Sequence, residues 1–221
     1  IGLRHQITAI HQASVYLGLN TLKNIALTLA TIGVLPRQNK AGFDMNAFWL
    51  HSLAVATVAR RLAEWLMIPA NETADYFSAG LLHDVGKVVF ALYLAEEFKQ
   101  ALARAKDGSI PLHQAETEFL GANHADMGAL LARKWGFPDI LAQGIASHHG
   151  PFEDEVPRIT ACVVAANLVC KLDALSDPEN TPEEPLPPGI QSIFRHDLSG
   201  LRKALPDLDR EVDKAKIFIS A

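Results

Sequence analysis

Apolar residues recur at intervals of three and four along almost the whole chain, which is the pattern of helices that bury one face. The segment over residues 45–66 shows it most clearly, because His51, Val55 and Val58 fall on one stripe at offsets of four and seven. His51 is therefore predicted to face the core rather than water. The alternating pattern of half-buried strands is absent from the sequence, so we predict an all-α fold.

Glycine, proline and capping residues divide the rest of the chain into further predicted helices. These run roughly over residues 6–17, 22–29, 71–82, 88–106, 112–119, 125–135, 140–148 and 158–172. We expect residues 1–175 to form one helical domain and residues 176–189 to form a proline-rich acidic loop. Residues 190–221 return to a helical pattern and are predicted to pack on the same domain as a tail.

Composition narrows the classes of partner. Hydrophobic residues make up 49% of the 221, and the net charge is −5 with a pI near 6.0, so no basic field favours nucleic acid. No apolar run reaches the roughly 18 residues of a membrane span. Cys162 and Cys170 lie eight residues apart on one predicted helix, about 12 Å along its axis, which is too far for a disulfide. They are predicted to be core residues of a cytoplasmic protein.

The segment GLLHDVGKVVF, residues 80–90, carries three charged or ionisable groups, His83, Asp84 and Lys87, inside an otherwise apolar run. Other histidines stand at helix boundaries: His124 opens HADMG, and the pair His148 and His149 precedes a glycine. Imidazole and carboxylate ligands suit divalent Mn, Fe, Co, Ni or Zn. Such an ion can activate water and bind phosphoryl oxygens, and a lysine one turn away can neutralise a phosphate.

Several stretches of the chain resemble a known family in their order and spacing. They are QASVYLGLNTLKNIAL, FWLHSLAVA, AGLLHDVGKVVF, ETEFLGANHADMGALLARKWGFPDI and GIASHHG. Together they resemble the HD superfamily of metal-dependent phosphohydrolases and, more closely, the HDOD family, the HD-related output domains of bacterial signalling proteins. The resemblance implies a multi-helix HD-superfamily bundle. It also implies that the helical leader usual in that family would precede Ile1.

The HD-GYP relatives, which hydrolyse cyclic di-GMP, extend the resemblance to single residues. His51 matches their first histidine, His83 with Asp84 the namesake pair, and Lys87 the catalytic lysine. The remaining matches are His124 at the HxxxG histidine and His148 with His149 at the paired histidines.

Three positions depart from the HD-GYP pattern. The glycine-tyrosine-proline segment is replaced by HHGPFEDEVP, the later aspartate is Asn167, and an extra glutamate one turn before the first histidine is Ala47. Two divalent ions would bring four positive charges, against which the candidate ligands offer only Asp84. A low-dielectric pocket tolerates such an imbalance poorly. The charge count therefore favours a single ion held by His51, His83, Asp84 and Asn167 over a dinuclear centre.

Each residue also has an ordinary structural interpretation. His51 alone is typical of a hydrogen-bonded core histidine, and Lys87 is typical of a side chain that extends to solvent. His148 and His149 end a helix, where they can interact with its dipole. The other histidines, His5, His11, His113 and His196, are assigned to the surface or the core. Only their occurrence together, in the order of the family, favours a common polar pocket.

Two functions follow from the resemblance. The first is a signalling output or regulatory domain with a retained HD-type pocket, little catalysis, and other signalling proteins as partners, with a homodimer left open. The second is a metal-dependent phosphohydrolase acting on a nucleotide or cyclic dinucleotide, in which Asp84 and Lys87 would be the catalytic residues. The sequence favours the first function, because Asn167 and the missing glycine-tyrosine-proline segment count against enzymatic activity.

Overall fold

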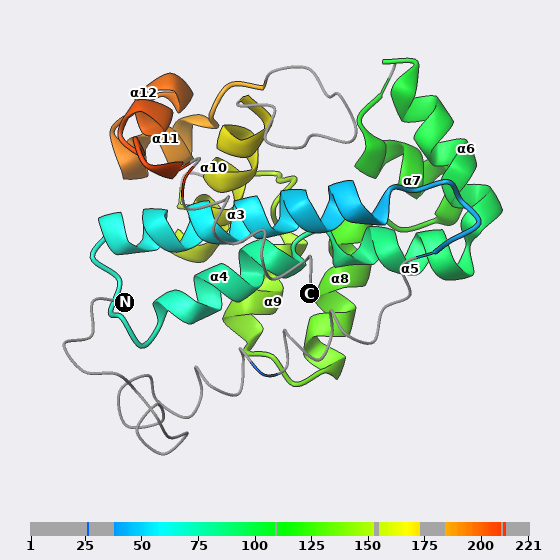
Figure 1. Cartoon of the computed structure of the whole chain (residues 1–221), viewed down its shortest axis with the longest axis horizontal. Coiled ribbons are helices and arrows are strands. Elements are labelled where there is room, and N and C mark those ends of the chain that lie inside the picture. The colour runs from blue at the N-terminus through cyan, green and yellow to red at the C-terminus, as the bar shows by residue number, and fades with distance from the viewer. Residues whose placement is uncertain are drawn as a thin grey trace.

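The computed structural model describes residues 26, 38–108, 110–152, 155–172, 184–208 and 210. Its helices are α3 (Met45–Trp65), α4 (Thr73–Leu82), α5 (Val85–Tyr93), α6 (Ala95–Lys106), α7 (Leu112–Leu120), α8 (His124–Lys134), α9 (Asp139–Ala146), α10 (Arg158–Leu172), α11 (Pro188–Phe194) and α12 (Leu198–Lys203). No strand occurs among these residues, so the all-α prediction is confirmed (Figure 1). The predicted helix over 6–17, nearly all of that over 22–29, and most of the acidic loop lie outside the described residues.

The long helix α3 crosses the domain, and α4 runs back along it (Figure 1). Asp44 caps α3 by accepting hydrogen bonds from the backbone N–H groups of Asn46 and Ala47 at 2.9 and 3.0 Å. Gly80 lets α4 approach closely, because a Cβ there would lie 2.8 Å from the Cα of Ala56. This close crossing sets the separation of His51 on α3 from His83 at the end of α4.

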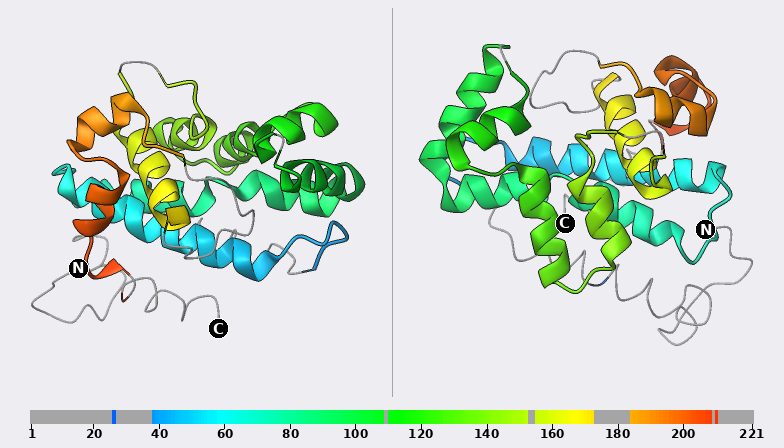
Figure 2. Two further views of the ribbon diagram at one scale, coloured as in Figure 1. Left: turned by 90° about the horizontal axis from the view of Figure 1, so that it is seen from above. Right: turned by 180° about the vertical axis from the view of Figure 1, so that it is seen from behind.

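Helix α10 lies against α3 and is buried on all sides. Its apolar residues surround the whole helix rather than one face, which is the pattern of a central core helix. Both Cys162 and Cys170 are buried there and form no disulfide, as the spacing predicted. Helices α11 and α12 pack beside α10 (Figure 2).

Two hydrophobic clusters share α3 and α5. The larger contains Ala54 and Val85 and extends over α4, α8, α9, α10 and the two C-terminal helices. The smaller contains Trp49 and Val88 and extends over α6 and α7. His51 on α3 and Lys87 on α5 therefore lie at the boundary between the clusters. Polar groups can gather there without interrupting either apolar core.

The predicted helix over residues 88–106 is wrong as a single element. The chain breaks at Leu94, whose φ of −130° and ψ of 46° end α5 and begin α6. The bend brings the ring of Phe98 within 5.9 Å of Phe90 and 5.6 Å of Phe43, measured between centroids. Packing of these aromatic rings outweighs the helical propensity of the sequence at the break.

Smaller differences concern helix ends. Helix α4 has Glu72 at its N-cap position and begins at Thr73, slightly later than predicted, and α9 ends at Ala146, two residues earlier than predicted. Trp65, at the end of α3, is 37% exposed and meets the ring of His196 edge-on. In the part of the chain that the structure describes, no helix has the length and apolar character needed to span a membrane.

Candidate metal centre

His83 stands where α4 ends, and its ring is held by that helix. Its Nδ1 lies 2.8 Å from the carbonyl oxygen of Gly80, one of the carbonyls that a helix C-terminus leaves without a partner. A carbonyl only accepts, so Nδ1 carries the proton and donates. The buried Nε2 is then a lone-pair donor, 3.3 Å from Oδ2 of Asp84, and makes no hydrogen bond.

His148 repeats this arrangement at the end of α9. Its Nδ1 donates to the carbonyl oxygen of Ile145 at 2.7 Å, and its buried Nε2 lies 3.5 Å from Oδ1 of Asp84. That Nε2 also makes no hydrogen bond. Burial holds the pKa of His148 down at about 3, so the ring is neutral. Two helix ends thus aim two imidazole lone pairs at one carboxylate, which is how proteins orient metal-binding histidines.

Asp84 is the centre of the cluster. Its Oδ1 lies 3.1 Å from Nε2 of His124, on the same side as His148, while its Oδ2 lies 2.8 Å from Nζ of Lys87, on the same side as His83. Burial acts to raise the pKa of Asp84, but the electrostatic effects of the neighbouring His83, Lys87 and His124, with a hydrogen bond from His124, outweigh it and hold the pKa well below its usual range. The carboxylate is therefore ionised and available as a ligand.

His124 opens α8 and is bound on its other side by Glu116 of α7. Oε2 of Glu116 accepts a hydrogen bond from the backbone N–H of His124 at 2.8 Å and lies 2.5 Å from its Nδ1. Burial acts to lower the pKa of His124, but Glu116 and Asp84 outweigh it and raise the pKa to about 9. Gly86 lets this residue approach Asp84, since a Cβ at Gly86 would lie 2.1 Å from the carbonyl oxygen of His124.

The ring of His149 lies beside the rings of His124 and His148. Its Nε2 lies 2.8 Å from Nε2 of His124, and burial together with the neighbouring His148 and His124 lowers the pKa of His149 well below its usual value. His149 is therefore neutral, and its Nε2 accepts a hydrogen bond from Nε2–H of His124. His113, which was assigned to the surface or the core, is half-buried and stacks on His149 with ring centroids 4.2 Å apart. It lines the same pocket as the cluster.

Two groups of side chains bring possible ligand atoms within 4.8 Å of one another. One contains Asp84, His124, His148 and His149, and the other contains His51, His83 and Asp84. The ring of His51 is buried, with its centroid 5.5 Å from that of His83. The buried lone pairs of His83 and His148 fit a metal ion. A set of imidazoles with a single carboxylate is typical of Zn, Fe, Co, Ni or Mn sites.

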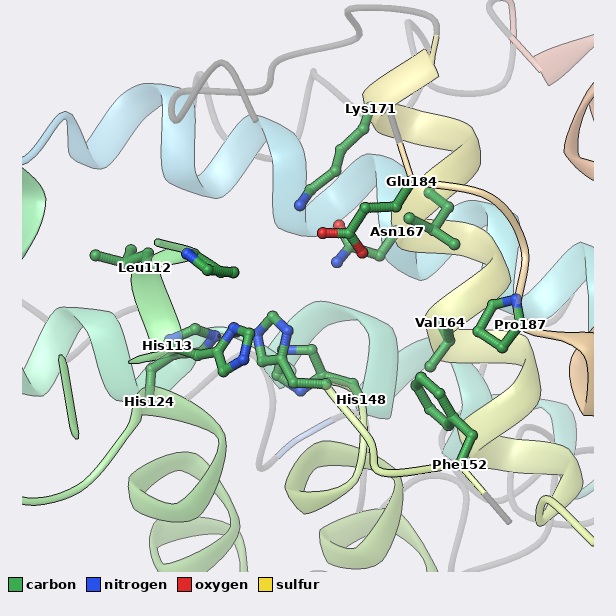
Figure 3. Close-up of a pocket in the computed structure, with 13 residues that line it drawn as sticks. Leu112, His113, His124, His148, Phe152, Val164, Asn167, Lys171, Glu184 and Pro187 are labelled. Carbon is green, nitrogen blue, oxygen red and sulfur yellow. Dashed lines mark hydrogen bonds between the residues drawn. The ribbon is translucent and has the colours of Figure 1, made fainter. Parts of the chain in front are cut away.

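A pocket of about 600 Å³, including its open mouth, lies over the histidines (Figure 3). His113, His124 and His148 line one side, and Asn167, Lys171 and Glu184 lie across from them (Figure 3). Oδ1 of Asn167 is buried and makes no hydrogen bond. A ligand that enters the pocket would therefore meet the imidazoles on one side and an amide, an ammonium and a carboxylate on the other.

The structure brings together the histidines and the aspartate that the sequence singled out. Asn167 shares a pocket with three of those histidines. The interpretation of Lys87 as a solvent-directed side chain is wrong, because it is 5% exposed and paired with Asp84.

Glu116 was missed by the sequence reasoning. Its position carried a sign, because it falls on the apolar stripe formed by Leu112, Ala115 and Phe119 of α7. A carboxylate on a buried helix face needs a partner.

Comparison with known proteins places this geometry in a family context. The family model described as HDOD domain matches residues 1–151. An uncharacterized protein of Treponema pallidum is 27% identical over 197 residues, and ribonuclease Y of Aquifex aeolicus is 32% identical over 137 residues. These alignments cover 88% and 62% of this chain but only 37% and 18% of the two relatives.

Among solved structures, an HDOD domain protein of unknown function from Geobacter sulfurreducens superposes with a TM-score of 0.71 at 26% identity. That superposition covers 97% of this chain and 74% of the other. The fold therefore occurs in a solved protein along nearly the whole of this chain.

Proposed function

The chain belongs to the HDOD domain family, and we propose that it is a regulatory domain of bacterial signal transduction whose pocket binds one divalent metal ion with little or no turnover. Its partners are other signalling proteins of the cytoplasm rather than nucleic acid. One observation carries the metal part of the proposal. In both His83 and His148, Nδ1–H donates to a carbonyl at a helix end, and the buried lone pair of Nε2 points at Asp84. Buried lone pairs without hydrogen bonds are costly in a protein that never binds a cation.

The candidate metal centre has little negative charge, which argues against rapid hydrolysis of phosphate esters. Asp84 is the only carboxylate in the two groups of possible ligands. Asn167 is neutral, and Glu116 is engaged by His124. A hydrolytic centre must neutralise both its metal ions and a substrate, and one free carboxylate offsets little of that charge.

The proposal is tested by the metal content of the full chain, purified without added metal or an affinity tag. We expect about one Mn, Fe, Co, Ni or Zn ion per chain, and its loss in His148→Ala. His196→Ala, at an exposed histidine beside Trp65, is the matched control and should keep the metal. Little metal in the wild-type chain, even after incubation with Mn or Fe, would overturn the metal site. Rapid hydrolysis of nucleotides or cyclic dinucleotides would overturn the claim of little turnover.

A second function, metal-dependent phosphodiester hydrolysis, is favoured by the buried Asp84–Lys87 pair and by the similarity to ribonuclease Y. A metal ion in the pocket would supply Lewis acidity. Lys87 would bind a phosphoryl oxygen, and Asp84 would hold the reacting groups in place. Asn167→Asp separates the two functions because it adds the missing carboxylate. If the chain is a weakened enzyme, this variant raises metal-dependent hydrolysis well above the wild type, whereas a purely regulatory pocket shows no such gain.

A further inference from the structure

The carboxylate of Asp84 is shared between two sides of the centre, and the sides differ in one respect. Oδ1 faces His124 at 3.1 Å and His148 at 3.5 Å, both donors of the first possible ligand group. Oδ2 faces His83 at 3.3 Å, and it is also the atom bound by Lys87 at 2.8 Å. Oδ1 is thus surrounded by imidazoles, one of them the protonated ring of His124, while Oδ2 has the ammonium of Lys87 as its neighbour.

We propose that the ammonium group of Lys87 takes the place of one cation in this centre, so that a metal ion binds on the Oδ1 side of Asp84, to His124, His148 and His149. This inference rests on the proposed function, since it requires the pocket to bind a metal. It further assigns the ion to one of the two possible ligand groups and gives Lys87 a role that the sequence did not predict.

The position of Lys87 is fixed by its helix. It lies three residues after Asp84 in the first turn of α5, between Gly86, which packs against His124, and the core residue Val88. Its side chain is 5% exposed, so the ammonium cannot leave for water without a rearrangement of α5. A buried ammonium is stable only beside an opposite charge, and Asp84 supplies one.

A metal ion bound to Oδ2 would therefore lie close to a fixed positive charge. Like charges at this separation repel strongly in a buried site. The His51 and His83 side also provides only two imidazoles besides the shared carboxylate. Charge and ligand number both disfavour an ion there while Lys87 is present.

When an incoming metal ion displaces the Nε2 proton of His124 to water, the Oδ1 side offers three imidazoles and a carboxylate oxygen, a four-ligand set that satisfies Zn or Co. Glu116 adds a second negative charge behind His124. One divalent ion and Lys87 then carry three positive charges against the two carboxylates. Two metal ions with Lys87 would carry five, so the arrangement with a single ion is much closer to neutrality.

The test is a Co²⁺ titration of the full chain, followed by the visible absorption of bound cobalt and by equilibrium dialysis. We expect one Co²⁺ per wild-type chain. His149→Gln, on the Oδ1 side, should weaken binding by roughly 10- to 100-fold, as loss of a ligand or its support does. His51→Gln, on the other side, should change the affinity by less than about 3-fold and leave the spectrum intact, since mutations that share no contact with a site act independently of it.

Lys87→Met removes the charge and keeps the length of the side chain, so it should allow a second Co²⁺ to bind. Lys87→Arg keeps the charge and should retain one ion, which shows that the effect of Lys87→Met comes from charge rather than from misfolding. Lys134→Met, at an exposed lysine of α8, is the matched control and should also retain one ion.

The outcomes separate this inference from the proposed function. Two ions in the wild-type chain, or one ion lost in His51→Gln and kept in His149→Gln, would overturn the role of Lys87 and leave metal binding standing. An unchanged stoichiometry in Lys87→Met would overturn it as well. No cobalt in the wild type or in any variant would overturn the proposed metal site together with this inference.

Discussion

Glu116 and His124 are joined at two atoms of the histidine. One oxygen, Oε2, accepts the backbone N–H of His124 and also binds its Nδ1. The first contact fixes where α8 begins, and the second fixes the orientation of the imidazole and the position of its Nδ1 proton. Nε2 of His124 is thereby directed at Asp84 and His149. Glu116, which belongs to neither group of possible metal ligands, therefore sets the geometry of His124, which belongs to one of them.

We predict that Glu116→Gln weakens Zn²⁺ or Co²⁺ binding by roughly 10- to 100-fold. The amide still accepts the backbone hydrogen bond, but it lacks the charge that makes His124 a strong donor to the metal. Competition with a chromophoric chelator measures the change. The control is Glu118→Gln, two residues along the same helix and exposed, which should leave the affinity as it is. Equal affinities for wild type and Glu116→Gln would show that Glu116 serves only the fold.

Helices whose ends are determined by their own residues were predicted correctly from the sequence. Helix α10 was predicted with the ends it has, because its apolar residues and the preceding Pro157 define it locally. The long helix α3 follows in the same way from its apolar stripe and the capping Asp44. The break at Leu94 was missed because it depends on where Phe98 meets Phe43, a residue more than fifty positions earlier. Long-range packing of this kind leaves no local pattern.

The same distinction between local pattern and long-range packing applies to the candidate site. The order of the histidines and Asp84 allowed their common pocket to be predicted, since the family resemblance supplied the long-range information. The state of Lys87 was not predicted, because whether a lysine reaches solvent depends on the helices packed around it. Glu116 could have been found from its place on the apolar stripe of α7. The position of a charge in a helical pattern indicates burial, but only the fold identifies its partner.

Gly86→Ala should disrupt both the fold and the site. The added Cβ would lie 2.1 Å from the carbonyl oxygen of His124, so α5 and α8 must move apart. We expect a loss of about 3 kcal/mol in the free energy of unfolding, at the upper end of overpacking, measured by urea denaturation. Gly108→Ala is the comparison: its Cβ meets no atom, but its φ of 76° costs about 1 kcal/mol. Metal binding should fall only in Gly86→Ala, and a similar loss of stability in both would contradict the close contact.

Removal of metal should lower thermal stability by mass action. An ion at about 100 times its dissociation constant stabilises the native state by about 2.7 kcal/mol, which is roughly 5–10 °C in Tm for a chain of this size. We expect a chelator to lower Tm by that amount in the wild type. In His148→Ala the chelator should have little effect, because a ligand is already missing, whereas His196→Ala should respond like the wild type. The same response in His148→Ala and in the wild type would exclude this centre as the source.

Tyr76 provides a prediction at high pH that is independent of the metal. Its side chain is 5% exposed within the larger hydrophobic cluster, and burial, with a smaller effect of Cys162, raises its pKa to about 12. The unfolded chain ionises near the ordinary pKa of 10, so it releases the proton first as the pH rises. The contribution of the neutral phenol to stability is therefore fully present below pH 10 and is lost as the pH rises through 12.

We predict that Tyr76→Phe, which cannot ionise, makes the free energy of unfolding fall less steeply above pH 10. The midpoint of alkaline unfolding should rise by roughly 0.5 pH unit, measured by circular dichroism along a pH series. Tyr93→Phe, at a ring that is 79% exposed, is the matched control and should keep the alkaline midpoint of the wild type. Identical alkaline midpoints for Tyr76→Phe and the wild type would mean that Tyr76 ionises without unfolding the chain. Its hydroxyl would then reach water through a local opening of α4. The first turn of that helix would open while the close contact with α3 at Gly80 stays in place.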